Sequence, residues 1–225
     1  MAGLIFEGLD AATVRANLDR ARDEIARAAA VAGRAADEVE VLAAVKYIPA
    51  DELAVLAEAG IELVGENRAQ ELEHKAGSHP GRFTWDFIGQ LQSRKVKQIL
   101  PHVRYIHSVA SDSVLAQLAK HAPPGTEVFV EVNVAGETGK SGVAPDELLA
   151  FLERSPVTVV GLMTMPPLAR SPEDNRAHFA ALRELADGHG LPQLSMGTSQ
   201  DYVVAVEEGA TIVRLGTCLY TSGAP

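Results

Sequence analysis

Two groups of residues, far apart in the sequence, have side chains that could do chemistry together. Lys46 ends an apolar run over residues 39–45, and a lysine desolvated by apolar neighbours supplies the neutral amine that Schiff-base formation requires. Ser199, Gly216 and Thr217 combine hydroxyl groups with a glycine that lets a ligand approach the backbone. Such a set suits a phosphate group, and we expect Ser199 to be the N-cap of the helix that follows it. Singly, a strand-end lysine is more often a surface charge, and a serine or glycine is more often a cap or a turn.

The alternation of short apolar runs with helical segments predicts a fold that brings these groups together. Strands are predicted over residues 39–45, 62–64, 84–88, 103–106, 127–132, 157–162, 193–196 and 211–215. Helices are predicted over 10–32 before the first strand, and then over 49–60, 68–75, 93–100, 111–120, 145–153, 172–188 and 200–208. Eight strand–helix repeats can close into a barrel, and no GxGxxG follows the first strand to indicate an open dinucleotide-binding sheet. We therefore predict one domain over residues 1–225, a (βα)8 TIM barrel with an extra N-terminal helix.

Polar residues follow the predicted strands at their carboxyl ends, where the active site of a TIM barrel is built. The loops after strands 7 and 8 often bind phosphate in this fold, and they carry Ser199, Gly216 and Thr217. A phosphate site that faces Lys46 predicts pyridoxal 5′-phosphate (PLP) held as a Schiff base. A Schiff-base aldolase acting on a phosphorylated sugar is an alternative with the same residue types. Asn67, after strand 2, either lines the cofactor face or turns the chain.

Composition argues against several partners. Lys plus Arg number 20 against 30 Asp plus Glu, a net charge of −10 spread along the chain, so nucleic acid is not an expected partner. No stretch approaches the roughly 20 apolar residues of a membrane span, and the first residues do not read as a secretion signal. The single cysteine, Cys218, agrees with a reducing compartment. We expect a cytoplasmic protein without membrane or metal partners.

The sequence resembles the YggS/PROSC family of pyridoxal phosphate homeostasis proteins, related in fold to the barrel domain of alanine racemase, a PLP fold-type III enzyme. The resemblance spans nearly the whole chain. It rests on AAVKYIP (43–49), LVGENRAQEL (63–72), WDFIGQLQSRK (85–95), IHSVAS (106–111), VNVAGETGKSGV (132–143), GLMTMPP (161–167) and SMGTSQDYVVAVEEGATIVRLGT (195–217). It implies that Lys46 is the cofactor lysine, that Ser199, Gly216 and Thr217 bind the phosphate, and that Arg214 faces the pyridine nitrogen. Departures from the usual pattern are Val45, Asp86 where a histidine often follows the tryptophan, Thr198 and Cys218.

Two features favour a carrier over a catalyst. If Arg214 faces the pyridine nitrogen it can only donate, which leaves that nitrogen unprotonated and the cofactor a weaker electron sink. Racemisation on this fold uses a second base from an added β domain, and only residues 218–225 follow the last strand. We therefore expect a non-catalytic, monomeric PLP carrier in intracellular PLP homeostasis, with PLP-dependent apoenzymes or metabolites as recipients. The alternative is a fold-type III racemase-like enzyme that acts on an amino acid.

Overall fold

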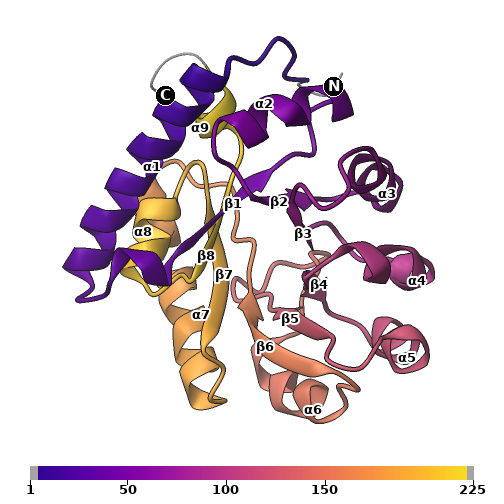
Figure 1. Ribbon diagram of the computed structural model, residues 1–225. Coiled ribbons are helices and arrows are strands. Elements are labelled where there is room, and N and C mark those ends of the chain that lie inside the picture. The colour runs from indigo at the N-terminus through magenta and orange to yellow at the C-terminus, as the bar shows by residue number, and fades with distance from the viewer. Residues whose placement is uncertain (1–4, 222–225) are drawn as a thin grey trace.

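Eight parallel strands close into a barrel in the computed structural model, which describes residues 5–221 (Figure 1). The strands pair in sequence order from β1 to β8, and β8 closes the ring on β1. They are β1 (Glu40–Ala44), β2 (Leu63–Glu66), β3 (Thr84–Phe87), β4 (Tyr105–Val109), β5 (Glu127–Glu131), β6 (Thr158–Met163), β7 (Gln193–Thr198) and β8 (Ile212–Leu215). The predicted TIM barrel is confirmed, and each predicted strand overlaps an observed one.

Helices precede, connect and follow the strands. They are α1 (Ala11–Val31), α2 (Leu53–Glu58), α3 (Ala69–Ser78), α4 (Val96–Ile99), α5 (Asp112–His121), α6 (Leu148–Glu153), α7 (Arg176–Gly188), α8 (Tyr202–Glu207) and α9 (Thr217–Tyr220). Short 3₁₀ turns begin several segments that the sequence predicts as continuous helix. In the predicted 93–100 segment, α4 is one turn between the 3₁₀ turns Ser93–Lys95 and Leu100–His102. The helix α9, directly after β8, was not predicted.

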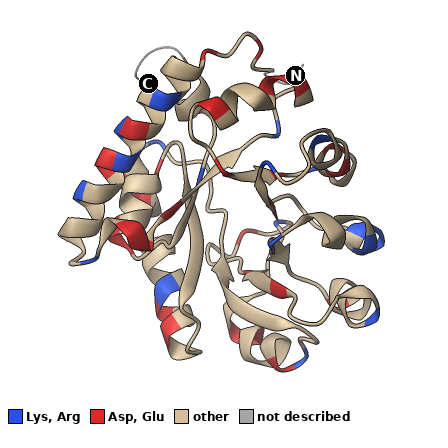
Figure 2. Ribbon diagram, in the orientation of Figure 1, with Lys and Arg blue, Asp and Glu red and all other residues tan. Residues whose placement is uncertain are grey.

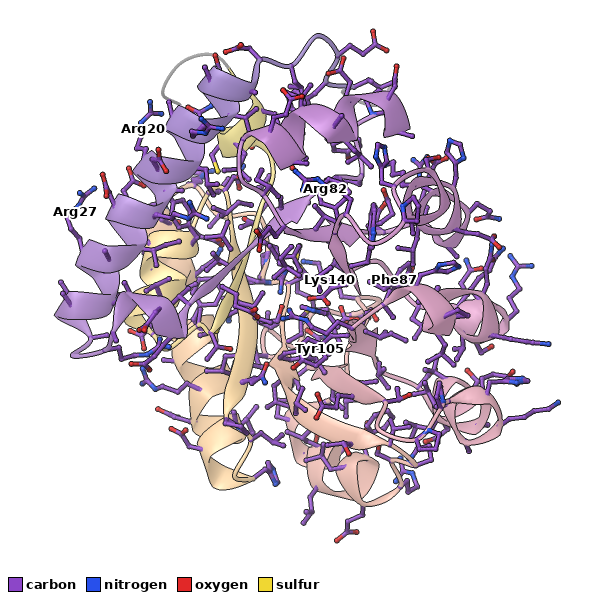
Figure 3. All side chains as sticks on the ribbon, in the orientation of Figure 1. Arg20, Arg27, Arg82, Phe87, Tyr105 and Lys140 are labelled. Atoms are coloured by element: carbon purple, nitrogen blue, oxygen red, sulfur yellow. The ribbon has the colours of Figure 1, made fainter. Side chains whose placement is uncertain are left out.

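The extra helix α1 follows the predicted amphipathic pattern. Asp10 is its N-cap and accepts the N–H of Thr13 at 2.7 Å. One face buries apolar residues, among them Val14, Leu18 and Ile25, and packs against α8 and α9. Arg20 and Arg27 point from the opposite face into solvent (Figure 3). Within residues 5–221, no helix combines the length and apolar character needed to cross a membrane.

The barrel interior contains an apolar layer with polar side chains beside it. The layer consists of Leu42, Phe129, Met163 and Ile212, one from each of four strands. Both signs of charge occur on the outer helices, for example on α1 and α7 (Figure 2). A few charged groups are nevertheless buried, among them Glu66, Lys75, Asp86 and Arg214.

Candidate functional site

A cavity of about 540 Å³ opens at the carboxyl ends of the strands, and we call it the mouth cavity. Its wall contains all of the predicted site residues, namely Lys46, Asn67, Ser199, Arg214, Gly216 and Thr217. These residues lie up to 171 positions apart in the sequence, from 46 to 217, and the barrel brings them to one place. The geometry therefore unites the amine, the hydroxyl groups and the guanidinium that the sequence singles out.

Lys46 is exposed at the mouth cavity, so the expectation of a desolvated lysine is wrong for this structure. The chain leaves β1 with Val45 fully buried in the core, and the next side chain points the other way, into open space. Nζ of Lys46 lies 4.8 Å from the centroid of the Tyr47 ring, a cation–π distance. The amine is thus free to meet a ligand that enters the cavity.

A buried ion pair holds the backbone just before this lysine and just after the neighbouring strand β2. Nζ of Lys75, on α3, lies 2.6 Å from Oε2 of Glu66 and donates to the carbonyl of Val45 at 2.8 Å. The other Glu66 oxygen accepts the N–H of Asn67 at 2.7 Å. Glu66 and Lys75 are 0% and 2% exposed, so each charge depends on the other. The sequence analysis missed Lys75; its signal was a lysine three residues after the buried Leu72 of α3.

Ser199 lies beside the last loop of the barrel and is not the N-cap of α8, which corrects the prediction. The helix begins at Tyr202, and the carboxylate of Asp201 accepts the N–H of Thr198 instead. The Ser199 hydroxyl accepts the N–H of Gly216 at 2.9 Å and that of Cys218 at 3.4 Å. Ser199 therefore ties the loop after β7 to the first turn of α9.

Gly197 and Asn17 help to hold the loops after β7 and β8 in place. Gly197 has φ +90°, and a Cβ there would lie 2.6 Å from the Cβ of Ala205, so only glycine fits this position near the end of β7. Asn17 of α1 donates to the carbonyls of Leu219 and Thr221, both at 3.1 Å, and anchors α9. The hydroxyl of Thr217 is exposed on that anchored turn.

Arg214 is a buried guanidinium that faces the mouth cavity from β8. Nη1 donates to the carbonyl and the hydroxyl oxygen of Ser195, both at 2.6 Å. Nη2 donates to the carbonyl of Thr164 and contacts the Met165 sulfur, both at 2.9 Å. Burial lowers the pKa of Arg214 to about 10. Among the described residues Nε has no hydrogen-bond partner, which leaves this N–H for a ligand.

Two buried polar atoms of the cavity wall also lack hydrogen-bond partners within residues 5–221. They are Oδ1 of Asn67 and the hydroxyl of Tyr220, whose ring packs on Phe6 at 5.4 Å. Such atoms cost free energy unless a ligand or water satisfies them. A Cβ at Gly216 would meet nothing closer than 3.8 Å, so space beside that backbone is open. A polar ligand carrying an aldehyde, a phosphate and a hydrogen-bond acceptor fits this wall. Tyr220, which lies on the unpredicted α9, was missed by the sequence analysis.

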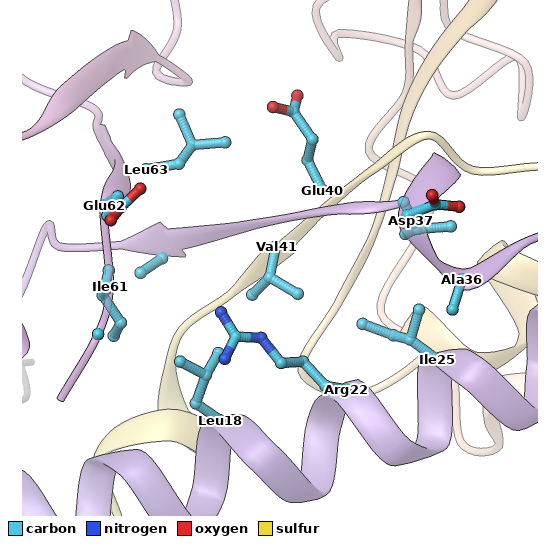
Figure 4. A pocket seen from close by; sticks show the side chains of 13 residues that line it. Leu18, Arg22, Ile25, Ala36, Asp37, Glu40, Val41, Ile61, Glu62 and Leu63 are labelled. Atoms are coloured by element: carbon cyan, nitrogen blue, oxygen red, sulfur yellow. The ribbon is translucent and has the colours of Figure 1, made fainter.

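A second cavity, of about 530 Å³, lies between α1 and the outer side of β1 and β2, and we call it the α1 cavity (Figure 4). Apolar side chains such as Leu18, Ile25 and Val41 line it, with Arg22 and Glu62 among its polar residues. None of the described side chains around it carries a buried polar atom without a partner.

Comparisons with known proteins show which family this chain resembles. The alanine racemase N-terminal domain model matches residues 16–223. A pyridoxal phosphate homeostasis protein of Aquifex aeolicus is 43% identical over 72% of this chain and 77% of its own length. The corresponding protein of Pseudomonas aeruginosa is 39% identical over 74% of this chain and 78% of its own.

Solved structures are similar over most of the chain. An unknown protein from Bifidobacterium adolescentis has a TM-score of 0.84 at 30% identity, covering 97% of this chain and 99% of its own. PipY of Synechococcus elongatus, solved with PLP bound, has a TM-score of 0.71 at 30% identity, covering 88% of this chain and 100% of its own. With the racemase-type barrel model matching nearly its full length and curated relatives this close, the chain belongs to the family of pyridoxal phosphate homeostasis proteins.

Proposed function

We propose that this protein binds PLP in the mouth cavity as a Schiff base on Lys46 and acts in PLP homeostasis as a carrier that does not turn over substrates. The observation that carries the proposal is the single cavity that unites the exposed amine of Lys46 with Ser199, Gly216 and Thr217. Family membership and the PLP bound to the related PipY support the same ligand.

Each residue has a chemical role in this proposal. Lys46 would supply the amine that bonds to the aldehyde carbon of PLP, with a C=N bond replacing C=O as one water molecule leaves. Addition of water would reverse the step and release the cofactor. The hydroxyl groups of Thr217 and Ser199 would hold the phosphate as O–H donors, in the open space beside the backbone of Gly216.

Two features of the wall favour holding the cofactor over catalysis with it. Bound PLP supplies an electrophilic aldehyde and an electron-accepting ring. Arg214 can only donate, and its Nε–H, directed at the pyridine nitrogen, would keep that nitrogen unprotonated and the ring a weak electron sink. Burial raises the pKa of the Tyr220 phenol, so at neutral pH this side chain is a donor and not a second base.

The exposure of Lys46 bears on how the cofactor leaves. An exposed Schiff base is open to attack by water or by the amine of a recipient, which suits transfer to PLP-dependent apoenzymes or to metabolites. The predicted site residues all come from one chain, which supports a monomer as the working unit.

The absorption spectrum of the purified protein mixed with PLP tests the proposal. We expect a visible band from the imine in the wild type and its loss in Lys46→Ala, with Lys140→Ala as a control lysine on an exposed loop. Amino-acid racemase and decarboxylase assays should show no turnover that depends on Lys46. Vigorous turnover abolished by Lys46→Ala would contradict the carrier role, and an unchanged spectrum in that variant would contradict the anchor.

A further inference from the structure

Four polar side chains inside the barrel form one chain of hydrogen bonds that ends at the mouth cavity. Nε2 of His107 lies 3.1 Å from Oδ2 of Asp86, and its Nδ1 lies 2.7 Å from the hydroxyl oxygen of Ser195. Nη1 of Arg214 lies 2.6 Å from the same oxygen. Since β4 and β7 are not neighbours in the barrel, the bond from His107 to Ser195 crosses its interior. We call Asp86, His107 and Ser195 the interior relay; they are all 0% exposed.

The partners of Ser195 fix where the protons lie. The Arg214 guanidinium can only donate, so the Ser195 oxygen is its acceptor. Among the described residues, Nδ1 of His107 is the one other partner of this hydroxyl, so the serine proton is satisfied only if it is donated to an unprotonated Nδ1. Asp86 accepts a hydrogen bond from Nε2–H of His107. Only the neutral Nε2–H form of His107 satisfies every group in the relay.

The far end of the relay is anchored at the amino-terminal side of the barrel. Arg104 donates to both oxygens of Asp86, at 3.2 and 2.9 Å, and the Tyr105 N–H donates at 3.1 Å. Burial alone would raise the pKa of Asp86, but the hydrogen bonds from His107 and Arg104 hold it below its usual value. Burial lowers the pKa of His107, in agreement with a neutral ring. The His107 ring also stacks on Phe129 at 4.6 Å, which fixes its plane.

Arg214 depends on the interior relay because its own hydrogen-bond acceptors are uncharged and are weak partners for a buried cation. No carboxylate lies within ion-pair distance of it among residues 5–221, and its acceptors are two carbonyls, one hydroxyl and one sulfur. The hydroxyl of Ser195 is the one side-chain oxygen in this set, and the relay decides which way its lone pair points. Loss of that lone pair would leave Nη1 with the Ser195 carbonyl alone, and would weaken the hold on the orientation of the guanidinium.

We propose that Asp86 and His107 are positioning residues that act through Ser195 to hold Nε of Arg214 toward the ligand of the mouth cavity. The ligand identity, the pyridine nitrogen of PLP, rests on the proposed function. A carboxylate can only accept, so Asp86 selects one tautomer of His107, whereas a histidine can present either a donor or an acceptor.

The protonation state of His107 in the cofactor-free protein tests the relay without any ligand. A long-range ¹H–¹⁵N correlation spectrum distinguishes the two neutral tautomers and the charged ring, and His107→Phe assigns the signal among the seven histidines. We expect the neutral Nε2–H tautomer between about pH 6 and 8. An Nδ1–H tautomer or a charged ring would overturn the relay.

PLP titrations of Ser195→Ala and His107→Phe test the positioning. The phenylalanine retains the stacking on Phe129, and Ser155→Ala is the control, because its half-buried hydroxyl donates to the Val157 carbonyl. We expect roughly five- to tenfold weaker PLP binding in both relay variants and a change of less than about twofold in the control. The pH at which the visible absorption band of bound PLP changes should shift in the relay variants and not in the control. The reason is that the pyridine nitrogen loses its fixed hydrogen-bond donor.

Thermal melting of the cofactor-free variants shows whether each one folds. If only one of the two relay variants folds, its PLP titration alone tests the positioning role. Wild-type affinity and an unshifted band in a folded relay variant would overturn the positioning role. Failure of the wild type to bind PLP would instead refute the proposed function and with it the ligand, while the tautomer of His107 would still decide the relay.

Discussion

The mouth cavity and the α1 cavity have almost the same volume, about 540 and 530 Å³, and differ in the chemistry of their walls. The mouth cavity has an exposed lysine, a buried guanidinium and two buried polar atoms without partners in the described residues. The α1 cavity has an apolar floor, and its charged residues, such as Arg22, reach solvent. Unsatisfied or desolvated polar groups cost folding free energy, so their concentration in the mouth cavity marks it as the functional cavity. Volume does not distinguish the two cavities.

The largest expected difference between the two regions concerns their charges. Lys75→Met leaves Glu66 buried without its partner, and we expect the free energy of unfolding to fall by about 3–5 kcal/mol. Arg22→Met in the α1 cavity removes an exposed contact with Asp19 at 3.8 Å and should cost about 1 kcal/mol or less. Urea unfolding of both variants measures the contrast. Equal losses in the two variants would contradict the dependence of the backbone beside the mouth cavity on a buried ion pair.

A smaller effect is expected from the hydroxyl of Thr217, for which the described residues provide no hydrogen-bond partner. Thr217→Val removes the exposed hydroxyl while retaining the shape of the side chain. Because that hydroxyl would bond a charged phosphate, PLP binding should weaken about tenfold, or about 1.4 kcal/mol. Glu62→Gln in the α1 cavity should leave the affinity within about twofold. A fluorescence or absorption titration compares them, and equal affinity of Thr217→Val and wild type would place the phosphate elsewhere.

The smallest expected effect is a pH dependence of stability that comes from the relay below the mouth cavity. The pKa of His107 is lowered in the folded protein, so the unfolded chain binds its proton first as the pH falls through about 6.5. The stability that the neutral ring contributes is complete above that pH and is lost below it. Asp86, whose pKa is also lowered, loses its contribution only below about pH 4. Between about pH 7 and 5, His107→Phe should therefore lose less stability than the wild type in denaturant titrations, and parallel curves would argue against a neutral His107.

Much of the fold follows from local sequence patterns. Each strand is a short apolar run and each connection begins with a helix signal, so the order of elements and the barrel could be predicted without knowledge of distant contacts. The errors lie at helix starts, where 3₁₀ turns replace the first helical turn, and at α9, which is too short to show a periodic pattern.

The sequence predicts which residues belong to the candidate site better than it predicts the contacts that these residues make. The residues at strand ends converge in any such barrel, so Lys46, Asn67 and Arg214 could be grouped from sequence. The partner of the Ser199 hydroxyl depends on how the loops after β7 and β8 lie relative to each other, which local pattern does not encode. The bond between His107 and Ser195, 88 residues apart, requires the closed barrel itself.

The attachment of PLP to Lys46 is the central claim, and chemical trapping tests it most directly. The purified protein would be incubated with PLP, reduced with borohydride, digested and analysed by mass spectrometry. The account predicts one phosphopyridoxyl group per chain, located on the peptide that contains Lys46 and absent from Lys46→Ala. A label on another lysine, such as Lys75 or Lys140, or no label at all, would contradict it.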